Sequence, residues 1–153
     1  MKFLELNVPP PIVFLSFAGL MWLVSALFPW ASFVLPAKKM IALGIAAAGG
    51  MVAGSSILSF LRVGTTVHPH EPKKTSKLVV TGANRVTRNP MYLSLLFVLI
   101  AWGVYLANIA SLLFVPLFVA YITRFQIIPE ERALASLFGS EYESYCKRVR
   151  RWL

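Results

Sequence analysis

The sequence predicts an all-α integral membrane protein with four transmembrane helices. Three observations carry this prediction: the composition, four long apolar runs and the distribution of charge. Of the 153 residues, 58% are hydrophobic and 14% are charged, whereas a soluble domain has about 25% charged residues. A soluble globule of this length cannot bury so much apolar surface, and disorder requires low hydrophobicity. The composition therefore argues against a soluble domain and excludes a disordered chain.

The four predicted spans cover residues 12–34, 40–61, 91–107 and 109–128. The first has 23 residues without a charge; at about 1.5 Å rise per residue, such a helix crosses a bilayer core. The second is rich in glycine and alanine, which let helix backbones approach closely, so we expect it to pack centrally. Only Asn108 separates the last two runs, which predicts an antiparallel helical hairpin.

Charge predicts the orientation. The formal charge is +9, from fifteen Lys or Arg and six Glu. With four spans, both termini and the connection 62–90 share one side and carry the cations, apart from Lys38 and Lys39. The positive-inside rule puts that side in the cytoplasm, most simply of a bacterial inner membrane. The basic surface then faces anionic lipids, and no nucleic-acid partner is predicted. We expect no cleaved signal peptide, because the first run is long for one.

Two polar segments fall on the cytoplasmic side of what we expect to be one membrane domain, residues 1–153. The connection 62–90 is longer than most unstructured connections, and such connections are often functional. Pro90 is expected in the first turn of the third span, with Asn89 as its N-cap. The segment 129–153 reads as amphipathic helices resting at the membrane surface: Pro129 opens the first, and Gly139 ends it.

Several polar residues at the span ends suit either a structural or a ligand-binding role. Glu130 and Glu131 complement a helix dipole, or they bind a cationic or hydroxyl-rich ligand. Arg88 and Arg124 suit lipid phosphates or a substrate carboxylate. Tyr92 is an interface aromatic or stacks on a planar ring.

No metal site is predicted. His68 and His70 have only Glu71 nearby, whereas transition-metal sites need three or four ligands. The single cysteine, Cys146, excludes an internal disulfide, and it lies in a charged segment without a histidine partner. Neither residue set indicates a metal centre or a thiol nucleophile.

An ordered set of short motifs fills the chain from Arg62 to Leu153. The motifs are Gly64-Thr65-Thr66, Leu78-Val79-Val80-Thr81-Gly82, Arg88-Asn89-Pro90-Met91-Tyr92, Glu130-Glu131-x-x-Leu134, Phe138-Gly139-x-Glu141-Tyr142-x-x-Tyr145 and Val149-x-Arg151. Together they resemble the isoprenylcysteine carboxyl methyltransferase family and its bacterial relatives, which shade into phospholipid methyltransferases. The resemblance implies a membrane methyltransferase that uses S-adenosyl-L-methionine on a lipophilic acceptor, such as an isoprenylcysteine-type carboxylate.

The resemblance also implies site residues in a cytoplasm-facing pocket. The cofactor-binding residues it implies are Leu78, Val79, Val80, Gly82, Asn84, Arg88, Asn89, Pro90, Tyr92 and Glu130. Glu131, Arg124 and Gln126 are the implied catalytic residues, since Arg124 or Gln126 falls near an arginine that relatives use for the acceptor carboxylate. Three positions depart from the family pattern: Asn89 replaces a common His, Asn84 replaces a common Tyr, and Gln126 lacks the charge of an arginine.

The expected chemistry is a direct displacement, which depends mainly on close and aligned reactants. A carboxylate acceptor needs no base, whereas an amine or thiol needs Glu131 or a nearby water to take its proton. Phospholipid, amine and thiol acceptors therefore stay open. The other classes left open are a small four-span transporter, a non-enzymatic membrane scaffold and an NADPH-dependent enzyme similar to steroid reductases. The oligomeric state is not readable from the sequence.

Overall fold

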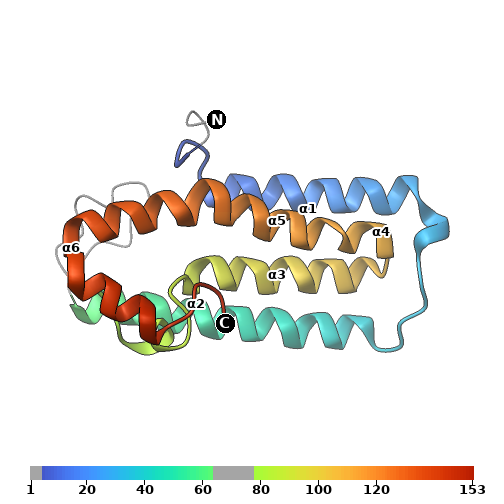
Figure 1. Ribbon diagram of the computed structural model, residues 1–153. Coiled ribbons are helices and arrows are strands. Elements are labelled where there is room, and N and C mark those ends of the chain that lie inside the picture. Colours follow the sequence, from blue (N-terminus) through green and yellow to red (C-terminus); the bar gives the residue numbers. More distant parts are fainter. Residues whose placement is uncertain (1–4, 64–77) are drawn as a thin grey trace.

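The computed structural model describes residues 5–63 and 78–153, and within these ranges every regular element is helical. The elements are α1 (Pro10–Leu27), η2 (Pro29–Ala31), α2 (Lys38–Val63), η4 (Gly82–Arg85), α3 (Pro90–Leu106), α4 (Ile109–Leu112), α5 (Phe114–Ile122), η5 (Thr123–Ile127) and α6 (Ile128–Arg148). Figure 1 shows α1, α2, α3 and α5 lying alongside one another. The Gly64-Thr65-Thr66 motif, His68, His70 and Glu71 lie outside the described residues.

The first helix ends earlier than the sequence predicts. It stops at Leu27 rather than at Val34, because Phe28 precedes Pro29 and the proline ring disfavours helical backbone at the preceding residue. Pro29 instead begins the short 3₁₀ turn η2, and Ser32 after it is extended. Pro29 therefore determines where this helix ends.

Three helical stretches are long and apolar enough to cross a membrane: Pro10–Leu27, Lys38–Arg62 and Ile109–Arg148. The helix α3 is apolar but has only 17 residues. The protein is therefore an all-helical membrane protein, and the fourth span stays a prediction. At Ala107 the backbone adopts the left-handed conformation, with φ of 50°, and the chain then returns beside α3 through α4 and α5 (Figure 1).

The central helix is α3, so the expectation that the glycine-rich second span packs centrally is wrong. Helix α3 contacts α1, α2, α4 and α5, whereas α2 packs mainly on α3 and on the η4 turn. Gly49 permits the close approach, since a Cβ atom there would lie 2.9 Å from Cβ of Phe97. The opposite face of α2 is open: Leu43 is 64% exposed and Met51 is 70% exposed. Small residues allow close packing on any face, but only one face of α2 uses them.

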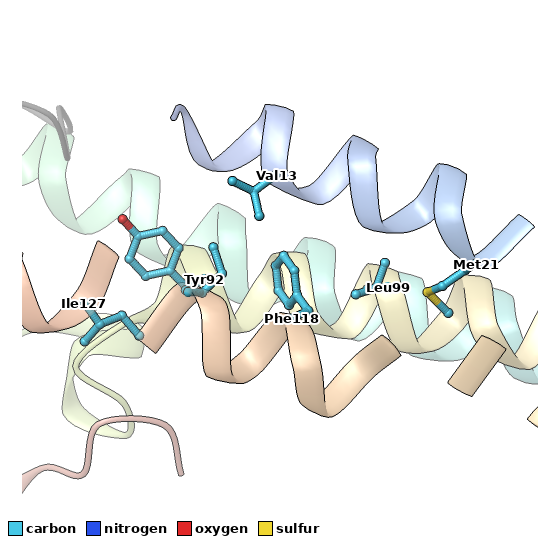
Figure 2. Close-up of a cluster of buried hydrophobic side chains, with 7 residues drawn as sticks. Val13, Met21, Tyr92, Leu99, Phe118 and Ile127 are labelled. Carbon is cyan, nitrogen blue, oxygen red and sulfur yellow. The ribbon is translucent and has the colours of Figure 1, made fainter. Parts of the chain in front are cut away.

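The buried core lies between α1, α3 and α5. Its side chains run along the helices in a row, with Met21 at one end and Tyr92 and Ile127 at the other (Figure 2). Phe118 is fully buried in the middle of the row, where the Phe17 ring meets it edge-on with centroids 5.5 Å apart. Tyr92 thus lies at the end of the bundle where α3 begins. We call this end the site end.

The opposite end, called the Asn108 end, is closed by hydrogen bonds. Asn108 Nδ2 donates to the Phe28 carbonyl at 2.8 Å and to Ser32 Oγ at 3.2 Å, and Asn108 Oδ1 accepts from the Ser111 amide at 3.1 Å. Ser111 Oγ donates to the Met21 carbonyl at 2.7 Å. Asn108 therefore caps α4 and joins three chain segments.

Candidate functional site at the start of α3

The chain segment that leads into α3 is joined to the last residues of the protein. The Arg88 amide donates to the Arg150 carbonyl at 2.9 Å, and Thr87 lies in a parallel β-bridge with Arg150. Thr87 Oγ1 and Asn89 Nδ2 both donate to the Arg151 carbonyl, at 3.2 and 2.8 Å. We call residues 149–152 the C-terminal strap. The strap brings together the two polar segments that the sequence separates by about sixty residues.

Asn89 does not act as the N-cap that its position suggests. Its side chain accepts no hydrogen bond from the first turn of α3, because Nδ2 is turned toward the strap. Pro90 does occupy the first helical turn, as predicted. The strap thus fixes the Asn89 amide group with its nitrogen already engaged.

Glu131 is held by two arginines. Arg151 donates from Nε to Oε1 at 3.0 Å and from Nη2 to Oε2 at 2.7 Å, which is a bidentate pair. Arg88 Nη2 donates to Oε1 of the same carboxylate at 2.9 Å. The hydrogen bonds that Arg151 donates to Glu131 raise the pKa of Arg151 above its ordinary value. This arginine clamp ties α6, the start of α3 and the C-terminal strap to one carboxylate.

Glu130 has a different partner. Tyr92 lies in the first turn of α3, and its hydroxyl donates to Glu130 Oε1 at 2.5 Å. Tyr92 itself is buried in the core, whereas Glu130 is half-buried. The core helix therefore positions one acid, and the arginine clamp positions its neighbour.

The residues from Leu78 to Arg85 form a wall against the C-terminal half of α6. Leu78 packs against the buried cluster of Tyr142, Tyr145 and Val149. Gly82 has φ of 59°, and a Cβ atom there would lie 2.1 Å from Ser59 Oγ of α2. Only glycine combines that backbone with so close an approach. Of the three apolar residues before it, Leu78 is half-buried, Val79 is buried and Val80 is exposed.

Asn84 lies at the centre of that wall. Tyr145 donates its hydroxyl to the Asn84 carbonyl at 2.7 Å, and the Ala83 amide donates to Ser55 Oγ at 3.2 Å. The η4 turn is thus attached to α6 on one side and to α2 on the other. Asn84 is 3% exposed, and its Nδ2 atom has no hydrogen-bond partner within the described residues.

Arg124 and Gln126 lie in the π-helical turn η5, between α5 and α6. Such turns are frequent at functional sites. This turn continues directly into α6, whose first turn contains Pro129, Glu130 and Glu131, as the sequence predicted. Arg124 is 51% exposed on its side chain and pairs with Glu5 at 3.0 Å. Gln126 is fully buried and donates from Nε2 to the Val8 carbonyl at 2.8 Å.

Helix α6 bends sharply at Gly139, where φ is 47° and ψ is −122° (Figure 1). A cavity of about 660 Å³ opens between its two limbs. Glu131 and Ala135 line it from the first limb, Tyr142 and Cys146 line it from the second, and Arg151 of the strap closes one side. The sequence predicted that the helix ends at Gly139; instead the chain bends there and continues as a helix, and this bend forms the space.

Four residues that organise the site were not among the predicted site residues. Thr87, Tyr145 and Arg151 lie within or beside the motifs that carry the family resemblance, and this proximity was the available signal. Glu5 had no signal, since its partners Arg124 and Arg132 lie more than a hundred residues away. Those two arginines hold the pKa of Glu5 below its ordinary value, chiefly through the Arg124 hydrogen bond.

Comparisons with known proteins place this chain in a family. The phospholipid methyltransferase family model matches residues 37–141. An uncharacterized protein of Haemophilus influenzae (strain Rd) is 51% identical over 63 residues, which cover 41% of this chain and all of that protein. No solved structure matches. Because the family match covers most of the sequence, the chain belongs to the phospholipid methyltransferase family, membrane methyltransferases related to isoprenylcysteine methyltransferases.

Proposed function

We propose that the site end binds S-adenosyl-L-methionine and that the protein methylates a lipophilic acceptor there. The family supports methyl transfer at a membrane in general. The observation that carries the finer proposal is the convergence of Tyr92, Glu130 and the Leu78–Arg85 wall at one end of the bundle, beside the α6 cavity.

The residues at the site end fit such a cofactor. S-adenosyl-L-methionine has a flat apolar ring system, a cationic centre and an amino-acid group. Leu78, Val79 and Tyr142 supply apolar and aromatic surface, while Glu130 supplies a carboxylate that complements positive charge. Buried polar atoms without partners, such as Asn84 Nδ2, are also expected where a ligand completes the hydrogen bonding.

The bound cofactor supplies an activated methyl group. The residues of this chain bind the cofactor, orient the reacting groups and exclude water. Tyr92 orients Glu130 through its hydroxyl. Glu131 was a candidate base, but its two oxygens accept three hydrogen bonds from Arg88 and Arg151. We assign Glu131 a positioning role, because both of its carboxylate oxygens are already occupied by arginine donors.

The acceptor is proposed to be either an isoprenylcysteine-type carboxylate or the amine of a lipid headgroup. A carboxylate acceptor calls for a cation, yet Arg124 already pairs with Glu5 and Gln126 is neutral. Gln126 Oε1 is buried and lacks a hydrogen-bond donor within the described residues. An N–H group of an amine would satisfy that oxygen, and for this reason we propose the amine as the acceptor.

The two acceptors give products that differ in stability toward base. Lipid extract is incubated with purified enzyme and methyl-labelled cofactor, and the labelled product is treated with mild alkali. Methyl esters of carboxylates release volatile methanol, whereas N-methyl groups stay in the product. We expect the label to be retained. Release as methanol would assign the carboxylate acceptor.

Cofactor binding is tested by calorimetry with S-adenosyl-L-methionine in detergent. Glu130→Gln keeps the size of the side chain but removes its ability to ionise beside a cationic ligand, and we expect at least about a tenfold loss of affinity, as for loss of a charge-assisted contact. Glu141→Gln, at an exposed position of α6, is the matched control and should bind like the wild type. Equal affinity for all three proteins would remove Glu130 from the site.

We further propose that the site end faces the cytoplasm of a bacterial cell, since it carries most of the cations. Cys146 is the only cysteine and lies at this end. A membrane-impermeant maleimide should label it in inverted vesicles and not in right-side-out vesicles. The reverse labelling pattern would contradict the proposed orientation.

A further inference from the structure

The π turn η5 lies in the middle of a helix that is otherwise continuous. Helical backbone runs from α5 through Thr123–Ile127 into α6 (Figure 1). The Ile128 amide donates to the Thr123 carbonyl, five residues earlier, whereas the hydrogen bonds of an α-helix join residues four apart. The turn therefore holds one residue more than an α turn would. Such turns are rare, so contacts outside the helix must favour this one.

The extra residue decides which side chain of α6 faces the core. Glu130 follows Phe118 by twelve residues, and an α-helix turns by about 100° per residue. In a continuous α-helix, Glu130 would lie about 120° from the Phe118 face, and Pro129 would lie about 20° from it. Because the π turn takes up one residue, Glu130 instead falls within about 20° of that face. Phe118 and Tyr92 belong to one buried cluster, so the π turn brings Glu130 to the Tyr92 hydroxyl.

The N-terminal segment binds this turn through two hydrogen bonds. Pro129 has no N–H group and cannot donate to the Phe125 carbonyl four residues earlier, and the Leu6 amide donates to that carbonyl at 3.0 Å. Gln126 is fully buried, and its Nε2 donates to the Val8 carbonyl at 2.8 Å. Both bonds attach the turn to the chain just before α1.

The C-terminal strap supplies another contact. Trp152 Nε1 donates to Thr123 Oγ1 at 3.1 Å, and the Trp152 side chain packs against the buried core. The same strap binds Glu131 through Arg151 and the start of α3 through Thr87. The segments at both ends of the described chain therefore meet at the turn that sets the register of α6.

We propose that Gln126 and Trp152 are positioning residues, which hold η5 as a π turn and thereby keep Glu130 on Tyr92. Without their contacts the turn adopts the commoner α form, and Pro129 takes the place of Glu130. This role of Gln126 uses Nε2 and leaves Oε1 to the acceptor proposed above. The consequence for cofactor binding rests on the proposed function, whereas the register of α6 does not.

The test first removes the two side-chain contacts. Gln126→Leu/Trp152→Phe, which we call the released variant, keeps apolar side chains at both positions but lacks both donors. Asn108→Ala/Trp102→Phe is the matched control, because it also removes one amide donor and one indole donor, at the Asn108 end. The control leaves every contact of η5 in place. Any difference between the two proteins is therefore specific to the turn.

The second step restores the register by a deletion. The deletion variant is the released variant without Arg124, the exposed residue of the turn. With one residue fewer between Phe118 and Glu130, a continuous α-helix puts Glu130 about 20° from the Phe118 face. A deletion can repair the released variant only if the register of α6 was lost. This repair distinguishes a positioning role from a general loss of stability.

The first readout is the coupling between Tyr92 and Glu130, which needs no ligand. Tyr92→Phe, Glu130→Ala and their combination are introduced into each protein, and melting temperatures are measured in detergent. Because both changes remove the same hydrogen bond, their shifts are not additive where that bond exists. We expect non-additive shifts in the wild type, the matched control and the deletion variant, and additive shifts in the released variant.

The second readout is the affinity for S-adenosyl-L-methionine, measured by calorimetry. The released variant should bind about tenfold more weakly than the wild type, as expected for loss of the Glu130 contact. The deletion variant and the matched control should stay within about twofold of the wild type, because less than about 0.5 kcal/mol of binding free energy changes when Glu130 keeps its place.

Persistent coupling in the released variant, equal loss of coupling in the matched control, or no recovery of coupling on deletion would each overturn the proposal. Wild-type protein that binds no S-adenosyl-L-methionine contradicts the proposed function instead, and the coupling still decides the register of α6. Far-ultraviolet circular dichroism checks the helical fold. A released variant that loses its helices is replaced by Gln126→Leu alone, with and without the deletion, and faces the same outcomes.

Discussion

The two ends of α3 carry the same kinds of residue and use them differently. At the Asn108 end, the amide of Asn108 makes three hydrogen bonds, and Ser111 and Trp102 donate to helix carbonyls of α1. At the site end, Asn84 Nδ2, Arg88 Nε and Gln126 Oε1 are buried without partners in the described residues. Polar groups thus complete the structure at one end and are available to a ligand at the other. This difference between the two ends is one reason why we propose the functional site at the start of α3.

The largest effect is expected from Glu131→Ala. This change leaves Arg88 and Arg151 without their carboxylate, and removing one partner of a partly buried charged network costs about 3 kcal/mol. The C-terminal strap should detach, and affinity for S-adenosylhomocysteine should fall with it. Thermal unfolding and calorimetry in detergent measure both effects, and Glu141→Ala is the matched control. A Glu131→Ala protein with wild-type stability and affinity would show that the clamp does not hold the site.

The opposite end gives the contrasting prediction. Asn108→Ala removes the α4 cap and two contacts to the η2 region, which should cost about 2 kcal/mol. Affinity for S-adenosylhomocysteine should change by less than about twofold, because Asn108 lies at the opposite end of α3 from the proposed site. A factor of ten in affinity would correspond to about 1.4 kcal/mol of binding free energy. The same two measurements check this result. A loss of binding comparable to that of Glu131→Ala would erase the proposed difference between the two ends.

Two glycines with positive φ provide a smaller and internally controlled comparison. Gly82→Ala should cost about 2 kcal/mol, because a strained backbone is combined with a Cβ atom 2.1 Å from Ser59 Oγ. Gly139→Ala should cost about 1 kcal/mol, because φ is also positive there but nothing lies within 4 Å of the added Cβ atom. Thermal unfolding of both variants tests the order. A reversed order would mean that the η4 turn does not depend on close contact with α2.

The smallest effect concerns the Glu5 contacts with Arg124 and Arg132. These contacts lower the pKa of Glu5 below its ordinary 4.5. Their stabilisation is therefore present above that value and is lost as the pH falls through the lowered pKa. At neutral pH, Glu5→Gln should melt slightly below the wild type, and the difference should shrink as the pH falls through the lowered pKa, and also in high salt. A difference that grows on acidification has the wrong sign for this account.

The sequence could predict the helical membrane fold, but not the contacts of the proposed site residues. Motifs singled out Leu78, Tyr92 and Glu130, and the backbone preference of glycine indicated a helix end at Gly139, where the structure has a sharp bend. The strap could not be foreseen, because Arg150 and Arg151 bind Thr87, Arg88 and Asn89 through main-chain carbonyls that every residue possesses.

Other misses have similarly physical causes. The small residues of α2 permit close packing but do not specify which face is used, so its peripheral place was not readable. The π turn at Thr123–Ile127 leaves no pattern in residue type, and it decides where Arg124 and Gln126 lie. The pairing of Glu5 with both arginines depends on the assembled bundle rather than on any local pattern.

The most direct test of the central claim follows a labelled methyl group from S-adenosyl-L-methionine into a membrane lipid extract. Purified wild-type protein should transfer the label to a lipid-soluble product, Asn108→Ala should retain this activity when assayed below its melting temperature, and Glu130→Gln should lose it. Transfer by Glu130→Gln at the wild-type rate, or no transfer by folded wild-type protein with any lipid extract from a bacterial membrane, would contradict the claim that the start of α3 is a methyl-transfer site.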